Sequence, residues 1–157
     1  MDYMTTYDAI VFPCDDRPPH TVPLMTSPLP APIPNPAEPW RCGRMPHPEV
    51  YMDYVAEGLG SQSWSYHTVV KLDCMTKNLP TPYIIFYPTI SRDGMAFPIN
   101  KCVREVQGSF YKESTAWRGN IVIAKYIDST YKAMVDLSMA DFPILKNYLS
   151  TCPHLRV

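Results

Sequence analysis

The strongest strand pattern in the chain lies in residues 117–126, which contain the β-branched run Ile121–Ile123. β-branched side chains pack well on a pleated sheet, so this run predicts a central strand. The corner Trp117–Asn120 leads into the strand, and the short turn Asp128–Thr130 follows it. We expect residues 131–137 to return beside it as the second strand of a hairpin.

A second hairpin is predicted upstream, from residues 64–73 and 82–87. The first segment alternates between two kinds of side chain, which is typical of a strand with two different faces. One face is predicted to carry Trp64, Tyr66, Thr68, Val70 and Leu72. Residues 82–87 are apolar on both faces, which favours an inner strand that is covered on both sides.

Three helices are predicted, over residues 48–60, 98–108 and 138–151. Apolar side chains recur at helical spacing in each segment, and each segment has a start or stop signal. The signals are Pro48 in a first turn, Gly108 at a helix end, and the capping box Ser138-Met139-Ala140-Asp141 followed by Pro143.

Twelve of the 18 prolines fall in residues 13–48. Proline removes a backbone donor and restricts the residue before it, so we expect an extended arm that wraps the globular part. Ile10–Phe12 is predicted to add an edge strand or to pack as a peptide. The predicted fold class is α+β, with residues 48–157 as one domain and residues 1–47 as the proline-rich arm. That domain holds a small, mostly antiparallel sheet of two hairpins with three helices packed on it.

Composition narrows the functional classes. The 157 residues have a formal net charge of −1 and only 18% charged side chains, which disfavours a nucleic-acid binder or a membrane-surface protein. No apolar run is long enough for a membrane span, and the N-terminal pattern does not predict a signal peptide. The five cysteines are widely spaced and form no CxxC motif, so we expect a cytoplasmic or nuclear protein that is not secreted.

The segment 98–150 carries one further pattern. It consists of Pro98-Ile99-Asn100-Lys101, Trp117-Arg118-Gly119-Asn120-Ile121-Val122, Lys125, Tyr131, Asp136, Asp141 and Pro143. This pattern resembles a group of small uncharacterised proteins of mushroom-forming fungi. The resemblance implies the same order of segments and an intracellular fungal origin. The group has no known activity, so the resemblance implies no functional residue.

Candidate chemical sites are few, and we predict no metal site and no cofactor. Cys42 with His47, and Cys152 with His154, do not have the spacing of a known zinc finger. His67 and Cys74 lack a third group in the sequence that would orient a catalytic pair. The carboxylates are explained structurally: Asp15 and Asp16 by a solvated turn before Arg17, Asp141 by helix capping, and Asp136 by pairing with Arg118 or Lys125.

Aromatic residues suggest where binding could occur, since tyrosine and tryptophan suit protein interfaces. The predicted function is a non-enzymatic, intracellular interaction module that binds a protein partner or itself. A first alternative is a small-molecule-binding protein or minor enzyme with an aromatic pocket between sheet and helices. A second is an adaptor that displays a PxxP ligand, made of Pro36, Pro39 and Arg41. The candidate surface residues are Trp64, Tyr66, Tyr83, Tyr87, Trp117 and Arg118. Trp117 is also expected to plug the end of the sheet while Arg118 caps a carbonyl.

Overall fold

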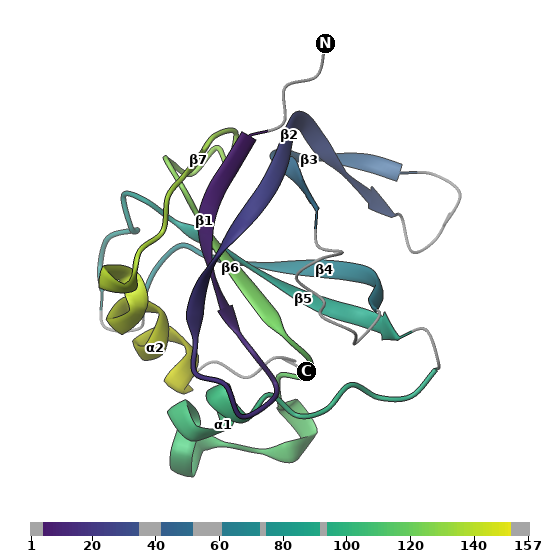
Figure 1. The fold of residues 1–157 in the computed structure, drawn as a ribbon. Coiled ribbons are helices and arrows are strands. Elements are labelled where there is room, and N and C mark those ends of the chain that lie inside the picture. Colours follow the sequence, from purple (N-terminus) through teal and green to yellow (C-terminus); the bar gives the residue numbers. More distant parts are fainter. Residues whose placement is uncertain (1–4, 35–41, 52–60, 73–74, 92–93, 152–157) are drawn as a thin grey trace.

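A computed structural model describes residues 5–34, 42–51, 61–72, 75–91 and 94–151 (Figure 1). In the described chain six strands lie in the order β3-β2-β1-β6-β5-β4, β7 pairs with β6 beside this path, and every pairing is antiparallel. The strands are β1 (Thr5–Phe12), β2 (His20–Pro34), β3 (Cys42–Tyr51), β4 (Ser61–Val69), β5 (Tyr83–Ser91), β6 (Ile121–Tyr126) and β7 (Met134–Val135). The helices are α1 (Lys101–Gln107) and α2 (Phe142–Thr151), with short 3-10 turns η1 (Gly108–Phe110), η2 (Glu113–Thr115) and η3 (Met139–Asp141).

β6 is the central strand, as its β-branched run predicts. It pairs with β1 on one side and with β5 on the other, so that Ile123 lies opposite both Ile10 and Ile85. Residues 121–124 are completely buried. The short return strand β7 pairs with the end of β6, which confirms the predicted hairpin.

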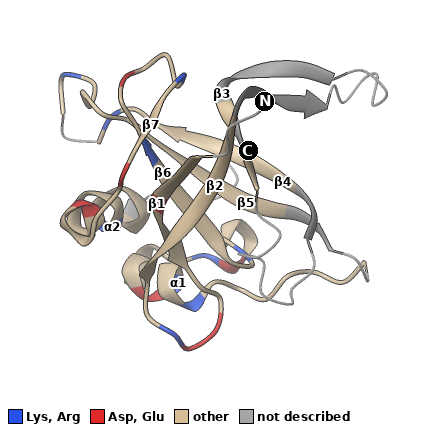
Figure 2. Cartoon of the chain, turned by 45° about the horizontal axis from the view of Figure 1, so that its top comes forward, with Lys and Arg blue, Asp and Glu red and all other residues tan. Residues whose placement is uncertain are grey.

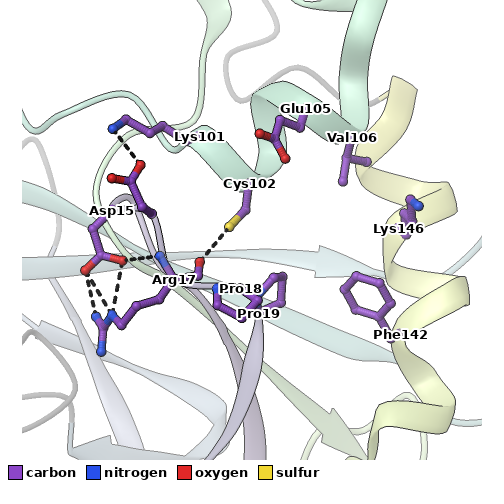
Figure 3. Close-up of a pocket in the computed structure, with 11 residues that line it drawn as sticks. Asp15, Arg17, Pro18, Pro19, Lys101, Cys102, Glu105, Val106, Phe142 and Lys146 are labelled. Carbon is purple, nitrogen blue, oxygen red and sulfur yellow. Dashed lines mark hydrogen bonds and ion pairs between the residues drawn. The ribbon is translucent and has the colours of Figure 1, made fainter.

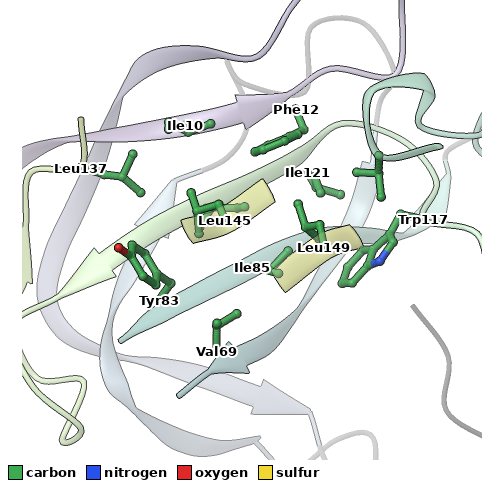
Figure 4. Packing of buried hydrophobic residues seen from close by; sticks show 12 residues of the cluster. Ile10, Phe12, Val69, Tyr83, Ile85, Trp117, Ile121, Leu137, Leu145 and Leu149 are labelled. Carbon is green, nitrogen blue, oxygen red and sulfur yellow. The ribbon is translucent and has the colours of Figure 1, made fainter. Parts of the chain in front are cut away.

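Two apolar clusters lie on opposite faces of the sheet. The first packs between the sheet and the two helices, with strand residues such as Ile85 and Ile121 against Leu145 and Leu149 of α2 (Figure 4). The second cluster lies on the other face and draws side chains from strands far apart in the sheet order. It runs from Val50 of β3 to Tyr66 of β4, so the sheet curls around it.

The predicted proline-rich arm, residues 1–47, belongs largely to the sheet in the parts that the structure describes. Residues 20–34 and 42–51 are strands of the sheet, and β1 lies between β2 and β6 rather than at an edge. Proline is compatible with these strands because each half of β2 has one partner in the described chain. Residues 20–24 pair only with β1, and residues 27–34 pair only with β3, through register shifts around Pro30. Prolines are tolerated at such edges and irregularities.

The helix prediction was right for two of three segments. α1 and α2 lie within the predicted ranges 98–108 and 138–151. The predicted helix 48–60 is wrong at its start, since residues 48–51 belong to β3, and residues 52–60 lie outside the described chain. Extended pairing with β2 outweighs the local helix signal there, because the sheet buries Pro48 and partly buries Val50.

The start of α2 is organised around one buried carboxylate. The capping box predicted from the sequence is present, with Ser138 Oγ accepting from the Ala140 N–H and Asp141 Oδ2 accepting from the Ser138 N–H at 3.0 Å. Asp141 Oδ1 also accepts from the Tyr83 hydroxyl at 2.7 Å and from Lys125 Nζ at 2.9 Å. The carboxylate therefore joins α2 to β5 and β6. Lys125 pairs with Asp141 and not with Asp136, which the sequence had suggested as its partner.

Candidate functional site

A pocket of about 540 Å³ lies between the connection from β1 to β2, helix α1 and helix α2 (Figure 3). Its lining combines charged side chains with an apolar base. The connection contributes residues 15–19, α1 contributes Lys101, Cys102, Glu105 and Val106, and α2 contributes Phe142 and Lys146. Figure 2 shows that charged residues lie mainly on helices and connections of this kind, while the described strands are almost free of them.

Asn100 places α1 at the pocket. It is the N-cap of the helix, and its Oδ1 accepts from the Val103 N–H at 3.1 Å. Its Nδ2 donates to the carbonyl of Phe12 at 2.6 Å and to that of Gly119 at 2.8 Å. One buried amide thus ties the first turn of α1 to the end of β1 and to the corner before β6.

The connection from β1 to β2 is held by two further hydrogen bonds. The side chain of Asn120 accepts from the backbone N–H of Cys14 at 2.8 Å. The Cys102 thiol of α1 donates to the carbonyl of Arg17 at 3.4 Å. Asn120 and Cys102 therefore hold the β1–β2 connection in place, and this connection forms one wall of the pocket.

Two ion pairs occupy the rim of the pocket on the side of the connection. Arg17 pairs with Asp15, which accepts from the Arg17 backbone N–H at 2.9 Å and from its guanidinium at 3.0 Å. These bonds hold the pKa of the Asp15 carboxyl below its ordinary value. Lys101 of α1 pairs with Asp16 at 3.0 Å. The turn predicted at Asp15 and Asp16 is therefore exposed, as expected, and its charges are matched by nearby cations.

Two charged residues of the pocket are not used in this way. The side chains of Glu105 in α1 and Lys146 in α2 make no hydrogen bond or ion pair within the described part of the chain. They carry opposite charges and come from α1 and α2, the two helices that line the pocket (Figure 3). A bound molecule would meet these two charges without first breaking an ion pair.

The base of the pocket is the outer layer of the helix-side core. Cys102, Val106 and Phe142 are partly buried and pack against the first apolar cluster. The Phe142 ring stacks on Phe12 with a centroid separation of 5.8 Å and an interplanar angle of 20°. The position of this aromatic base is thus fixed by the core rather than by exposed contacts.

The two described thiols are suited to a structural role. Burial raises the pKa of Cys102, and the carboxylates of Glu105 and Asp15 raise it further. Burial and the adjacent Asp15 also raise the pKa of Cys14. The thiolate is the nucleophilic form of cysteine, so these shifts disfavour both thiols as nucleophiles. The described residues also contain no group of three side chains that could hold a metal ion.

The aromatic residues predicted as a surface do not meet in one pocket. Tyr83 and Trp117 are buried in the helix-side cluster, and the half-buried Tyr87 packs against that cluster. Trp64 and Tyr66 pack against the cluster on the other face of the sheet. The prediction grouped side chains from the two strands without matching their faces, and alternation along each strand separates them. A pocket lined by all of these residues between sheet and helices is therefore wrong.

In the corner pair Trp117 and Arg118, the arginine caps a carbonyl as predicted. The guanidinium of Arg118 donates to the carbonyl of Phe97 at 3.0 Å. Asp136, proposed as a partner for Arg118, instead accepts from the backbone N–H of Asp8 at 2.9 Å. Trp117 is buried in the helix-side cluster, and the corner contributes no side chain to the pocket lining.

His67 lies among aromatic rings. Its Nε2 is hydrogen-bonded to the Tyr148 hydroxyl, and its ring meets Trp117 edge-on with a centroid separation of 6.0 Å. This contact links β4 to α2. Cys74, the other half of the Cys–His pair considered from the sequence, lies outside the described chain.

Other predicted residues also fall where the structure describes no side chain. These are the PxxP residues Pro36, Pro39 and Arg41, and the two Cys–His pairs Cys42 with His47 and Cys152 with His154. The PxxP ligand and the absence of a zinc site at these pairs therefore stay predictions.

Sequence patterns did not identify the pocket. Glu105 and Lys146 lie on two short helices separated by more than thirty residues, and neither belongs to a motif. The available signal was amphipathicity, since both side chains flank the apolar stripe that covers the sheet.

No helix of the described chain has both the length and the apolar character needed to cross a membrane. No family model, curated protein or solved structure matches this chain. The resemblance to small fungal proteins stays a prediction, and the function has to be argued from the chemistry of the residues themselves.

Proposed function

We propose that this protein is a non-enzymatic binding protein that holds a small charged molecule in the pocket between α1 and α2. The observation that carries this proposal is the pair of opposite charges, Glu105 and Lys146, which have no partner among the described residues and lie above an apolar base. The volume of about 540 Å³ falls within the range of roughly 300–1,000 Å³ that is usual for ligand sites.

The absence of catalysis is part of the proposal, and three features of the described chain support it. Cys102, the nucleophile nearest to the pocket, has a raised pKa. The most buried carboxylate, Asp141, is occupied by three donors at the start of α2. His67 is bonded to Tyr148 and is not among the residues that line the pocket. A cytosolic or nuclear setting, which keeps thiols reduced, suits the free thiols of Cys14 and Cys102.

A thermal-shift screen with charged metabolites tests the proposal. A ligand at 100 times its dissociation constant adds about 2.7 kcal/mol to stability, which is about 5–10 °C in Tm for a chain of this size. We expect at least one compound to raise the Tm of the wild type but not that of the double variant Glu105→Gln/Lys146→Met. The control variant Lys112→Met/Glu113→Gln removes two exposed charges outside the pocket and should keep the shift. A screen without any shift, or a shift that the pocket variant retains, contradicts the proposal.

A second candidate is the interaction module predicted from the sequence, and one observation favours it. Met25 of β2 and Tyr51 of β3 are cross-strand neighbours, and both are exposed, at 40% and 38%. Side chains directly opposite each other in an antiparallel pair share one face, so these two form an apolar patch. We propose self-association through this patch as the alternative function.

Light scattering over a range of protein concentrations tests this alternative. If the patch mediates self-association, the apparent mass of the wild type rises with concentration, and Met25→Lys abolishes the rise. Thr21→Lys adds the same charge to an exposed position of β2 and should leave the rise intact. A wild type that stays monomeric, or a Met25→Lys variant that still associates, excludes this patch as the interface.

A further inference from the structure

We propose that the ligand of the α1–α2 pocket is an apolar zwitterion, namely a free α-amino acid with a large apolar side chain. This inference rests on the proposed binding function and names the chemical class of its ligand. It comes from two lining charges that have no partner in the described parts of the chain, together with the apolar surface of the same pocket.

The charged side chains at the rim beside the β1–β2 connection already form ion pairs with each other or with α1. Asp15 accepts from both the backbone and the guanidinium of Arg17, and Asp16 accepts from Lys101. Each pair is internally neutral, so neither adds a net charge for a ligand to match. Within the described residues, the pocket charges without a partner are one carboxylate, Glu105, and one ammonium group, Lys146.

This balance selects against a ligand with a single charge. An anion would be attracted by Lys146 and repelled by Glu105, and a cation would experience the reverse. A zwitterion can place its ammonium group at Glu105 and its carboxylate at Lys146, so that both interactions are favourable. Hydrogen bonds between ionised groups are stronger than those between neutral groups, so both charges contribute to selectivity.

The base of the pocket supplies the second half of the recognition. Val106 and Phe142 present apolar surface from the two helices, and the Phe142 ring is held in place by its stacking on Phe12. An aromatic side chain can stack on such a preformed ring, and burying apolar surface is favourable at about 25 cal/mol per Å². A small polar amino acid such as glycine would gain only the charge contacts.

Titration calorimetry with four probes tests the proposal. L-phenylalanine carries both charges, N-acetyl-L-phenylalanine lacks the ammonium group, L-phenylalaninamide lacks the carboxylate, and glycine lacks the side chain. We expect L-phenylalanine to bind most tightly and each of the other three to bind about tenfold or more weakly. Equal affinity for L-phenylalanine and both blocked analogues would overturn the proposal.

Charge reversal gives a test that a misfolded variant cannot imitate. Lys146→Glu leaves two unpaired carboxylates, so the preferred probe should change from L-phenylalanine to the cationic L-phenylalaninamide. Glu105→Lys should change the preference to the anionic N-acetyl-L-phenylalanine. Lys112→Glu, an equal reversal at an exposed position outside the pocket, should leave L-phenylalanine preferred. An unchanged order of affinities in both pocket variants contradicts the proposal.

The outcome also separates this inference from the proposed function. If L-phenylalanine does not bind, but another charged compound raises the Tm of the wild type and not of the pocket variant, the binding function stands and the zwitterion does not. If no compound gives a shift that depends on the pocket, both fail.

Discussion

Replacing Asn100 by alanine should lower the free energy of unfolding by about 3 kcal/mol, which is about 6–12 °C in Tm for a domain of this size. Removing the N-cap acceptor of the Val103 N–H accounts for about 1 kcal/mol. The substitution also removes the Asn100 Nδ2 donor to the carbonyls of Phe12 and Gly119. This loss costs about 1–3 kcal/mol for each carbonyl that water does not reach. Thermal and urea unfolding followed by circular dichroism measure the loss.

Two comparison variants separate these contributions. Asn100→Asp keeps an acceptor for the helix N-terminus but removes both donors and sets a negative charge against two carbonyl oxygens, so it should be at least as destabilising as alanine. Asn147→Ala removes an exposed asparagine side chain from α2 and should change stability by less than about 0.5 kcal/mol. An Asn100→Ala protein as stable as Asn147→Ala would show that the hydrogen bonds from Asn100 to β1, α1 and the corner before β6 do not stabilise the fold.

Asp141→Ala should destabilise the protein by about 2–4 kcal/mol at neutral pH. Breaking a buried ion pair by removing one partner costs about 3–5 kcal/mol, and the lower range applies here because the Lys125 side chain keeps 22% of its surface exposed. The substitution also removes the acceptor for the Ser138 N–H and for the Tyr83 hydroxyl. Unfolding in urea at pH 7 measures the difference from the wild type.

The pH dependence of this difference has a definite sign. Burial alone would raise the pKa of Asp141, but hydrogen bonds from Ser138, Lys125 and Tyr83 outweigh it and hold the pKa below its ordinary value. The unfolded chain, with an aspartate pKa of about 3.9, therefore binds more protons between the two values. The stabilisation is fully present above about pH 5, about one unit above the unfolded pKa, and is lost as the pH falls through the folded pKa.

Urea unfolding between pH 7 and pH 2 checks this expectation. The difference between wild type and Asp141→Ala should be constant from pH 7 to about pH 5 and should shrink below about pH 4. Glu113→Gln, which neutralises an exposed carboxylate, should match the wild type throughout. A difference that persists unchanged at pH 2 would show that the cost comes from lost packing rather than from the charge.

Segments with strong local signals were predictable. The run Ile121–Ile123 is the centre of the sheet, and the predicted capping box opens the turn η3, which leads directly into α2. Both signals depend on residues within one or two turns of each other, so no tertiary information is needed to interpret them. The antiparallel character of the sheet also follows, because the predicted strands are joined by short connections.

The role of the N-terminal third was not predictable in the same way. Proline content favoured an extended arm, and extended backbone is what β2 has, but composition does not show that an extended segment pairs with other strands. β1 became central because Ile10 and Phe12 bury their side chains against β6 and the helices. That choice depends on which distant strand offers the best apolar partner, and not on the eight residues of β1 themselves.

The sequence by itself therefore determined the central strand, the two described helices and the absence of a recognisable catalytic motif. The tertiary structure decided that residues 20–51 join the sheet where they are described, that the aromatic residues divide between two faces, and that a pocket forms at all. The physical reason is the range of the interactions involved. Asn100 and Asn120 bond to residues 88 and 106 positions away, and these contacts bring the β1–β2 connection against α1. Only the folded chain brings Glu105 and Lys146 to one pocket, where neither has a partner among the described residues.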